Sequence, residues 1–202
     1  MLKKTIFLLL LMSISCTSEN EIMKHPLDKS EVRTLVLENG LRVYLLSDPK
    51  FNVSAASMSV EVGSLQDPET RQGLAHFLEH MLFLGTEKYP DVDEYSTYLK
   101  TYGGYSNAYT AGDHTNYQLQ VLPDGYEGAL DRFAQFFISP LFTDEYTSRE
   151  VNAVNSEYQK NIMNDEWRQF RIASQFAKDE HPARKFNIGT VSYTHLTLPT
   201  KA

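Results

Sequence analysis

Two histidines four residues apart constrain this chain more than any other feature. His76 and His80 enclose a short segment that also carries Glu79. If the segment is helical, both histidines lie on one face, one turn apart, with the glutamate beside them. The opposite face then carries apolar side chains at amphipathic spacing: Leu74, Phe77, Leu78, Met81 and Leu82. One side of this helix is therefore predicted to be core and the other a polar site.

The polar face has the composition of a zinc site. Two imidazoles one turn apart can bind one Zn²⁺, and the carboxylate of Glu79 can activate a water on that ion. His-x-x-Glu-His is the inverted form of the His-Glu-x-x-His zinc signature. A lone buried histidine is usually a hydrogen-bonded core residue, but two histidines and a glutamate on one polar face favour a metal. Downstream, Glu150 and Glu157 are seven residues apart and share one face of a predicted helix.

Composition sets the class of protein. The chain has 202 residues, 42% of them hydrophobic and 22% charged, which predicts one globular domain with a sizeable core. A net charge of −7 argues against a nucleic-acid partner. Cys16 is the only cysteine, so neither an intrachain disulfide nor a cysteine zinc site can form.

The first sixteen residues look like a secretory signal peptide. Lys3 and Lys4 precede a short apolar run, and small residues lead to Cys16. This pattern favours a lipoprotein signal with Cys16 lipidated, although Ser13 stands where an aliphatic residue is usual. We expect residues 17–30 to be a tether and the protein to lie on the periplasmic side of a bacterial envelope, lipid-anchored to a membrane. A soluble periplasmic or secreted protein is the alternative.

Residues 31–190 are predicted to form an α+β domain, an antiparallel sheet covered by helices. The Asn39-Gly40 turn predicts a hairpin, and alternating or 3.6-residue patterns predict the other elements. These are a hairpin over 33–45, a strand over 53–62, extended chain over 105–122, helices around 76–85, 93–102 and 126–137, and a long helix that starts near 144 or 148 and runs to about 178. In the third helix, Leu130, Phe133 and Phe137 are predicted to face inward. Residues 191–202 lack the charged, periodic pattern of the preceding helix and resemble translated adapter sequence. We therefore assign no role to His195.

Several segments resemble the insulinase and pitrilysin (M16) metallopeptidases, in the branch of the insulin-degrading enzymes. The resemblance covers about three quarters of the chain, in the family's order. It rests on five segments: residues 76–86, 106–110, 114–117, 128–137 and 149–168.

The resemblance implies a metallopeptidase domain with one zinc ion per chain. It implies that His76, His80 and Glu157 are the zinc ligands, with a water in the open fourth position. Glu79 would then be the general base, and Glu150 would orient a ligand histidine. For Glu150, a solvated helix charge remains the alternative.

The resemblance also implies a substrate site and a missing part. Asn107 and Ala108 correspond to the exposed strand edge on which the family binds peptides, although Asn107 could also merely hold a turn. His114 is expected to be structural. The family fold has four related α+β domains in two halves, and only most of the first is matched here. We therefore expect this chain to bind zinc but to cleave peptides poorly or not at all without the C-terminal half of its parent protein.

Three functions remain open at this point. The first is a zinc metalloendopeptidase that hydrolyses peptides. The second is a non-catalytic M16-like binding or assembly subunit, although such members typically lose a ligand or the base. The third is an unrelated protein with a structural metal or no metal. A structural zinc site normally has four protein ligands, often cysteines. Replacing Glu79 with Gln separates them, because only an enzyme would lose turnover and keep its metal.

Overall fold

The computed structural model describes residues 23–186 and Ile188. It divides into two compact units, one up to Phe51 and one from Asn52 onward. The predicted signal peptide with Cys16, residues 17–22 of the tether, and the tail over 191–202 lie outside the described residues. The boundaries expected between these segments and the domain over 31–190 therefore stay predictions.

The first unit is a β-hairpin. Strands β1 (Glu31–Val36) and β2 (Arg42–Ser47) pair antiparallel, with Val36 opposite Arg42. The turn closes because Gly40 takes φ +85° and donates its N–H to the Leu37 carbonyl at 2.8 Å. A left-handed residue at this point favours glycine, as the Asn-Gly pair predicted.

The second unit is built on a three-stranded antiparallel sheet. Strands β3 (Ser54–Val60), β4 (Tyr105–Thr110) and β5 (Thr115–Val121) follow the order β3-β5-β4, so β5 is central. On β5, alternate residues are buried, which reflects the period-two pattern of the sequence. Within the described chain β4 is paired on one side only, by β5.

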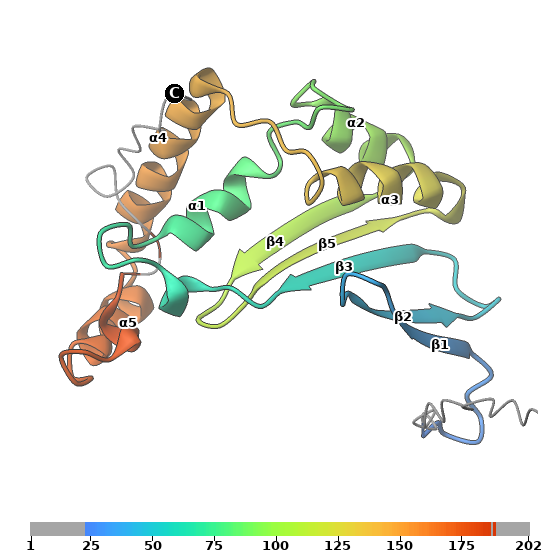
Figure 1. The fold of residues 1–202 in the computed structure, drawn as a ribbon, viewed down its shortest axis with the longest axis horizontal. Helices are drawn as coiled ribbons and strands as arrows, with labels where there is room; N and C mark the ends of the chain where they lie inside the picture. Colours follow the sequence, from blue (N-terminus) through green and yellow to red (C-terminus); the bar gives the residue numbers. More distant parts are fainter. Residues whose placement is uncertain (1–22, 187, 189–202) are drawn as a thin grey trace, which may run out of the picture. The chain divides into compact units, whose positions relative to one another are not determined.

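Helices α2 (Glu94–Thr101) and α3 (Tyr126–Gln135) cover one face of this sheet (Figure 1). Their apolar residues meet the inward side chains of β5, and Leu99 and Val121 are each only 1% exposed. Full burial of one such side chain stabilises the fold by about 1.5–3 kcal/mol. Of the three residues predicted inward on α3, Phe133 is buried and Phe137 half-buried, but Leu130 is 40% exposed, so its prediction is wrong. Leu130 lies at the edge of the apolar stripe, where helical spacing alone does not separate core from surface.

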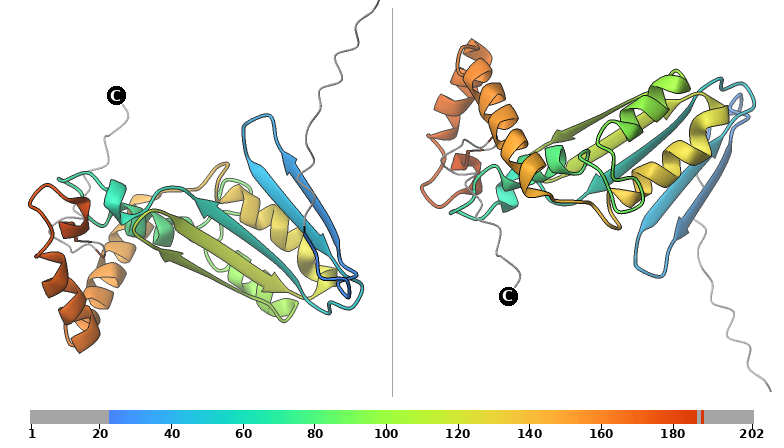
Figure 2. Two further views of the ribbon diagram at one scale, coloured as in Figure 1. Left: turned by 90° about the horizontal axis from the view of Figure 1, so that it is seen from below. Right: turned by 90° about the horizontal axis from the view of Figure 1, so that it is seen from above.

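Helices α1 (Leu74–Met81) and α4 (Asp144–Asn161) pack against each other at one end of the sheet (Figure 2). A separate cluster of buried residues lies between them: Phe77, Met81, Leu84, Val154 and Ile188. The predicted apolar face of α1 is right except at Leu78, which is 43% exposed. α1 ends at Met81, and Gly85, which we predicted to close it, lies three residues beyond its Leu82 C-cap at φ +96°.

The single long helix predicted over residues 144–178 is wrong. The chain breaks after α4 and restarts as α5 (Asp165–Ser174). Asn164 is the cause, because its side chain caps the new helix by accepting from the N–H groups of Glu166 and Trp167. No helix among the described residues is both long enough and apolar enough to cross a membrane. With its antiparallel sheet and covering helices, the structure confirms the predicted α+β class.

Candidate metal centre

Helix α1 carries three of the predicted site residues and is anchored at its first turn by a distant aspartate. The carboxylate of Asp67 accepts from the N–H of Gly73 at 2.7 Å and from that of Ala75 at 2.9 Å. These groups have no partner inside the helix, and the helix N-terminus favours a negative charge. Burial raises the pKa of Asp67, and the two N–H donors act in the opposite direction. Asp67 thus fixes the start of the helix that presents both histidines.

Three donor atoms converge between α1 and α4. The Nε2 atoms of His76 and His80 are 3.3 Å apart, and Oε2 of Glu157 lies 3.5 Å from the first and 3.6 Å from the second. Two Zn–N bonds of about 2.0–2.1 Å at a tetrahedral angle separate their donor atoms by about 3.4 Å. The observed triangle therefore has the size that a zinc site requires. Two imidazoles and one carboxylate leave a fourth position for a water or substrate, as in catalytic sites.

His80 is held by Glu150, two turns before Glu157 on α4. Its Nδ1 lies 2.7 Å from Oε1 of Glu150. Burial alone lowers the pKa of His80, but the hydrogen bond to Glu150 and the nearby carboxylate of Glu157 outweigh burial and raise that pKa to about 9. The nearby His80 ring in turn lowers the pKa of Glu157. A cation bound at the donor triangle would face the same two carboxylates that surround His80.

His76 is held by a main-chain group instead. Its Nδ1 lies 2.9 Å from the carbonyl oxygen of Ile188, which can only accept. Nδ1 therefore carries the proton in the neutral ring, and Nε2 keeps its lone pair toward the convergence point. Sequence reasoning missed this contact, because no side-chain pattern marks a carbonyl 112 residues away.

Glu79 lies beside the donor triangle but is not part of it. Its side chain is buried, and Oε2 accepts a hydrogen bond of 2.6 Å from Oγ1 of Thr110, the last residue of β4. The threonine fixes one oxygen of the carboxylate and leaves the other as an acceptor. Thr110 was also missed, although it closes one of the segments that carry the family resemblance.

The predicted substrate residues lie on β4, the strand that ends at Thr110. Asn107 is exposed and faces Gln118 of β5, whereas Ala108 is partly buried and faces Tyr117. Both belong to the strand whose outer edge is unpaired within the described chain. His114 is bound to Asp113 and Tyr109, consistent with the structural role expected for it.

Comparison with known proteins decides the family. Residues 42–180 match the family described as Insulinase (Peptidase family M16). This chain belongs to that family. It is 52% identical over 182 residues to the insulin-degrading enzyme of Homo sapiens, which covers 90% of this chain and 18% of that enzyme. It is 46% identical over 179 residues to the A-factor-processing enzyme of Saccharomyces cerevisiae, covering 89% of this chain and 17% of that protein.

A solved structure agrees with the sequence relatives. A crystal structure of pitrilysin superimposes with a TM-score of 0.82 at 39% identity, over 87% of this chain and 19% of that chain. The chain thus spans less than a fifth of the length of these relatives. The predicted M16 membership, insulin-degrading-enzyme branch and fold are confirmed. Zinc, the cofactor predicted from the sequence, is the metal of this family, and His76, His80 and Glu157 could form its site.

The predicted location in a bacterial envelope is wrong. The matching relatives include insulin-degrading enzymes of Homo sapiens, Mus musculus and Drosophila melanogaster. One relative from Arabidopsis thaliana is named as peroxisomal, with 51% identity over 90% of this chain. The prediction rested on a short apolar run before Cys16, a compositional signal that many apolar segments share. The comparisons give no support to a lipid anchor at Cys16 or to a membrane partner.

Proposed function

We propose that this chain is the zinc-binding domain of a metalloendopeptidase that hydrolyses peptides. The observation that carries the proposal is the triangle of donor atoms at 3.3–3.6 Å with Glu79 beside it. A zinc ion bound there would act as a Lewis acid on a peptide carbonyl and on an attacking water. His76, His80 and Glu157 would hold it, and Glu150 would keep His80 in the orientation that points Nε2 inward.

Glu79 is the proposed general base. Its carboxylate would take the proton of the attacking water and then deliver a proton to the departing amine. The hydrogen bond from Thr110 holds one oxygen of the carboxylate, and the other oxygen would accept the proton. Burial of Glu79 limits competing solvent around this oxygen. Because Glu79 is separate from the donor triangle, base and ligand functions can be separated by substitution.

The outer edge of β4 is the proposed peptide-binding surface. A strand edge pairs with the main chain of an extended peptide, so it accepts varied sequences. Asn107 and Ala108 lie in the middle of β4, and Thr110 at its end contacts Glu79. A peptide paired along this strand would therefore run directly toward the base.

The test separates metal binding from hydrolysis. The purified chain is compared with Glu79→Gln and Glu157→Gln, using a quenched fluorescent peptide and a peptide hydroxamate as a zinc-dependent probe. We expect the hydroxamate to bind wild type and Glu79→Gln but not Glu157→Gln, and hydrolysis by this short chain to be slow or absent. Any cleavage seen must vanish in Glu79→Gln. Cleavage that survives Glu79→Gln, or hydroxamate binding without zinc, would contradict the proposal.

A further inference from the structure

Three contacts fasten the chain around Lys185 to the start of α1. The Lys185 ammonium donates to the carbonyl oxygens of Leu65 at 3.0 Å and of Asp67 at 2.6 Å. The N–H of Phe186 donates to Oε1 of Gln72 at 2.7 Å. The carbonyl of Ile188 then meets His76 (described above). We name the contacts made by Gln72 and Lys185 the clasp.

The clasp lies in a partly buried setting. The Lys185 side chain is 14% exposed, and its bond to the Asp67 carbonyl is part-buried, so this bond is partly shielded from competing water, whereas the bond to the Leu65 carbonyl is exposed. Its nearest carboxylate, Glu69, is 3.6 Å away but 77% exposed, and an ion pair so exposed contributes little. The main-chain carbonyls, rather than the ion pair, therefore determine where Lys185 lies.

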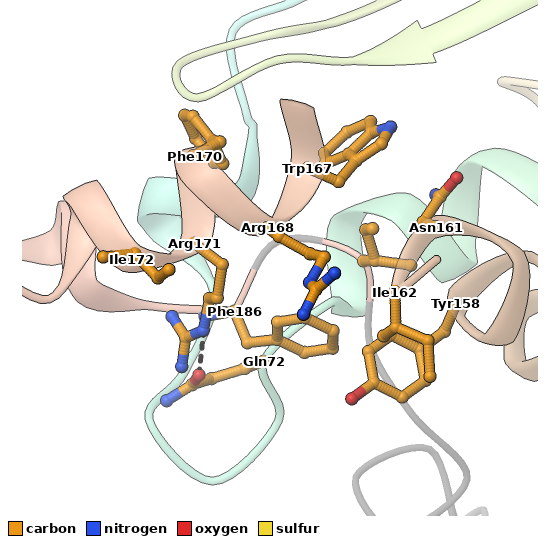
Figure 3. Close-up of a pocket in the computed structure, with 11 residues that line it drawn as sticks. Gln72, Tyr158, Asn161, Ile162, Trp167, Arg168, Phe170, Arg171, Ile172 and Phe186 are labelled. Carbon is orange, nitrogen blue, oxygen red and sulfur yellow. Dashed lines mark hydrogen bonds between the residues drawn. The ribbon is translucent and has the colours of Figure 1, made fainter. Parts of the chain in front are cut away.

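The clasped segment also touches the helix that carries Glu157. The Phe186 ring packs edge-on against Tyr158 of α4, with 5.3 Å between ring centroids. Ile188 is 6% exposed in the cluster between α1 and α4. Figure 3 shows Gln72 reaching Phe186, with Tyr158 nearby, on the wall of a pocket of about 490 Å³. Phe186 and Ile188 thus contact both ligand-bearing helices, α4 through Tyr158 and α1 through His76.

We propose that Gln72 and Lys185 are positioning residues of the zinc site. They hold the Ile188 carbonyl against Nδ1 of His76, which fixes the ring orientation and the tautomer that leaves Nε2 free for the metal. A ligand histidine whose second nitrogen donates to a fixed acceptor binds metal more tightly, because its orientation is already set. The inference rests on the proposed function in one respect, namely that zinc occupies the donor triangle.

The test measures metal binding by the full chain with two independent variants. Gln72→Met keeps the length of the side chain and removes the acceptor, and Lys185→Met keeps the aliphatic stem and removes the donors. Gln72→Glu retains an acceptor oxygen and is the rescue variant. Lys178→Met, at an exposed lysine, is the matched control. Zinc affinity is measured by competition with a chromophoric chelator, and site geometry by the visible absorption of bound Co²⁺.

We expect Gln72→Met and Lys185→Met each to raise the zinc Kd by about tenfold, the lower end of effects on outer partners of a metal site. The Co²⁺ spectrum should change in both, whereas Gln72→Glu and Lys178→Met should match wild type. Wild-type affinity and spectrum in both methionine variants would overturn the clasp and leave the proposed function intact. Failure of the wild-type chain to bind zinc would overturn both. If both variants unfold by circular dichroism, the clasp is a folding element and the positioning role is wrong.

Discussion

The two sides of the donor triangle are supported by different kinds of partner. On the α4 side, His80 faces the charged carboxylate of Glu150 at 2.7 Å. On the opposite side, His76 faces the neutral carbonyl of Ile188 at 2.9 Å. The Glu150 carboxylate raises the pKa of His80, and because it is a side chain, the sequence shows it directly. The Ile188 carbonyl carries no charge and depends on where distant main chain is placed. One imidazole is thus oriented by a charged side chain and the other by a main-chain carbonyl.

Removing either histidine should have the largest effect. We expect His76→Ala and His80→Ala each to reduce the zinc content of the purified chain to background, because two remaining donors hold zinc poorly. The two metal-free variants should differ in stability. Because His80→Ala removes the protonated ring between Glu150 and Glu157, it should unfold at a lower urea concentration than His76→Ala. Equal urea midpoints would show that the charge of the His80 ring does not contribute to the free energy of unfolding.

Neutralising Glu150 tests the charged side alone. We expect Glu150→Gln to raise the zinc Kd by about 10–100-fold, the usual range for loss of an outer carboxylate. Glu145→Gln, at an exposed position in the first turn of the same helix, is the control and should not change the zinc Kd. The Kd can be measured by chelator competition. An unchanged Kd in Glu150→Gln would make Glu150 a surface charge without a function at the site.

Removing Asp67 should affect both sides equally, because it anchors the helix that carries both histidines. Asp67→Ala leaves two helix N–H groups without their charged acceptor. We expect the free energy of unfolding to fall by about 2 kcal/mol, as for hydrogen bonds to a charged group. Urea denaturation of the metal-free chain measures this, with Asp124→Ala at an exposed position as control. A loss no larger than that of the control would mean that α1 starts without this cap.

The pH dependence of zinc binding should come from the His80 side. The pKa of His80 is raised to about 9 in the metal-free chain, so at neutral pH a proton must leave before zinc binds. Apparent zinc affinity should therefore fall about tenfold for each pH unit below about 9. Calorimetry in two buffers of different ionisation enthalpy should detect the released proton, and Glu150→Gln should reduce that release at pH 8. No proton release in wild type would contradict the charged state of His80.

The sequence predicted those parts of the site that depend on local spacing. His76, Glu79 and His80 lie within about one turn of α1, and Glu150 and Glu157 are about two turns apart on α4. The 3.6-residue helical repeat alone therefore places each set on one face of its helix. That the two sets meet was implied by family resemblance rather than by spacing. The Asn-Gly hairpin and the alternation of β5 are equally local and were also predicted correctly.

The remaining support comes from contacts across long stretches of chain. Thr110, Ile188 and Lys185 reach the site through the folded arrangement of strands and loops, and none has a neighbouring residue pattern that marks it. Asp67 precedes its helix by seven residues, outside the usual capping position. The break at Asn164 was missed because one asparagine within a predicted helix does not show that its side chain will cap a new helix by accepting from backbone N–H groups.

The metal content of the purified chain tests most directly whether zinc binds between α1 and α4. Elemental analysis of wild type beside Glu157→Gln, both checked for folding by circular dichroism, measures whether the donor triangle binds zinc by itself. We predict close to one zinc per wild-type chain and none in Glu157→Gln, because the third donor closes the triangle. A folded wild-type chain without zinc, or a Glu157→Gln chain that keeps it, would contradict a preformed site between α1 and α4.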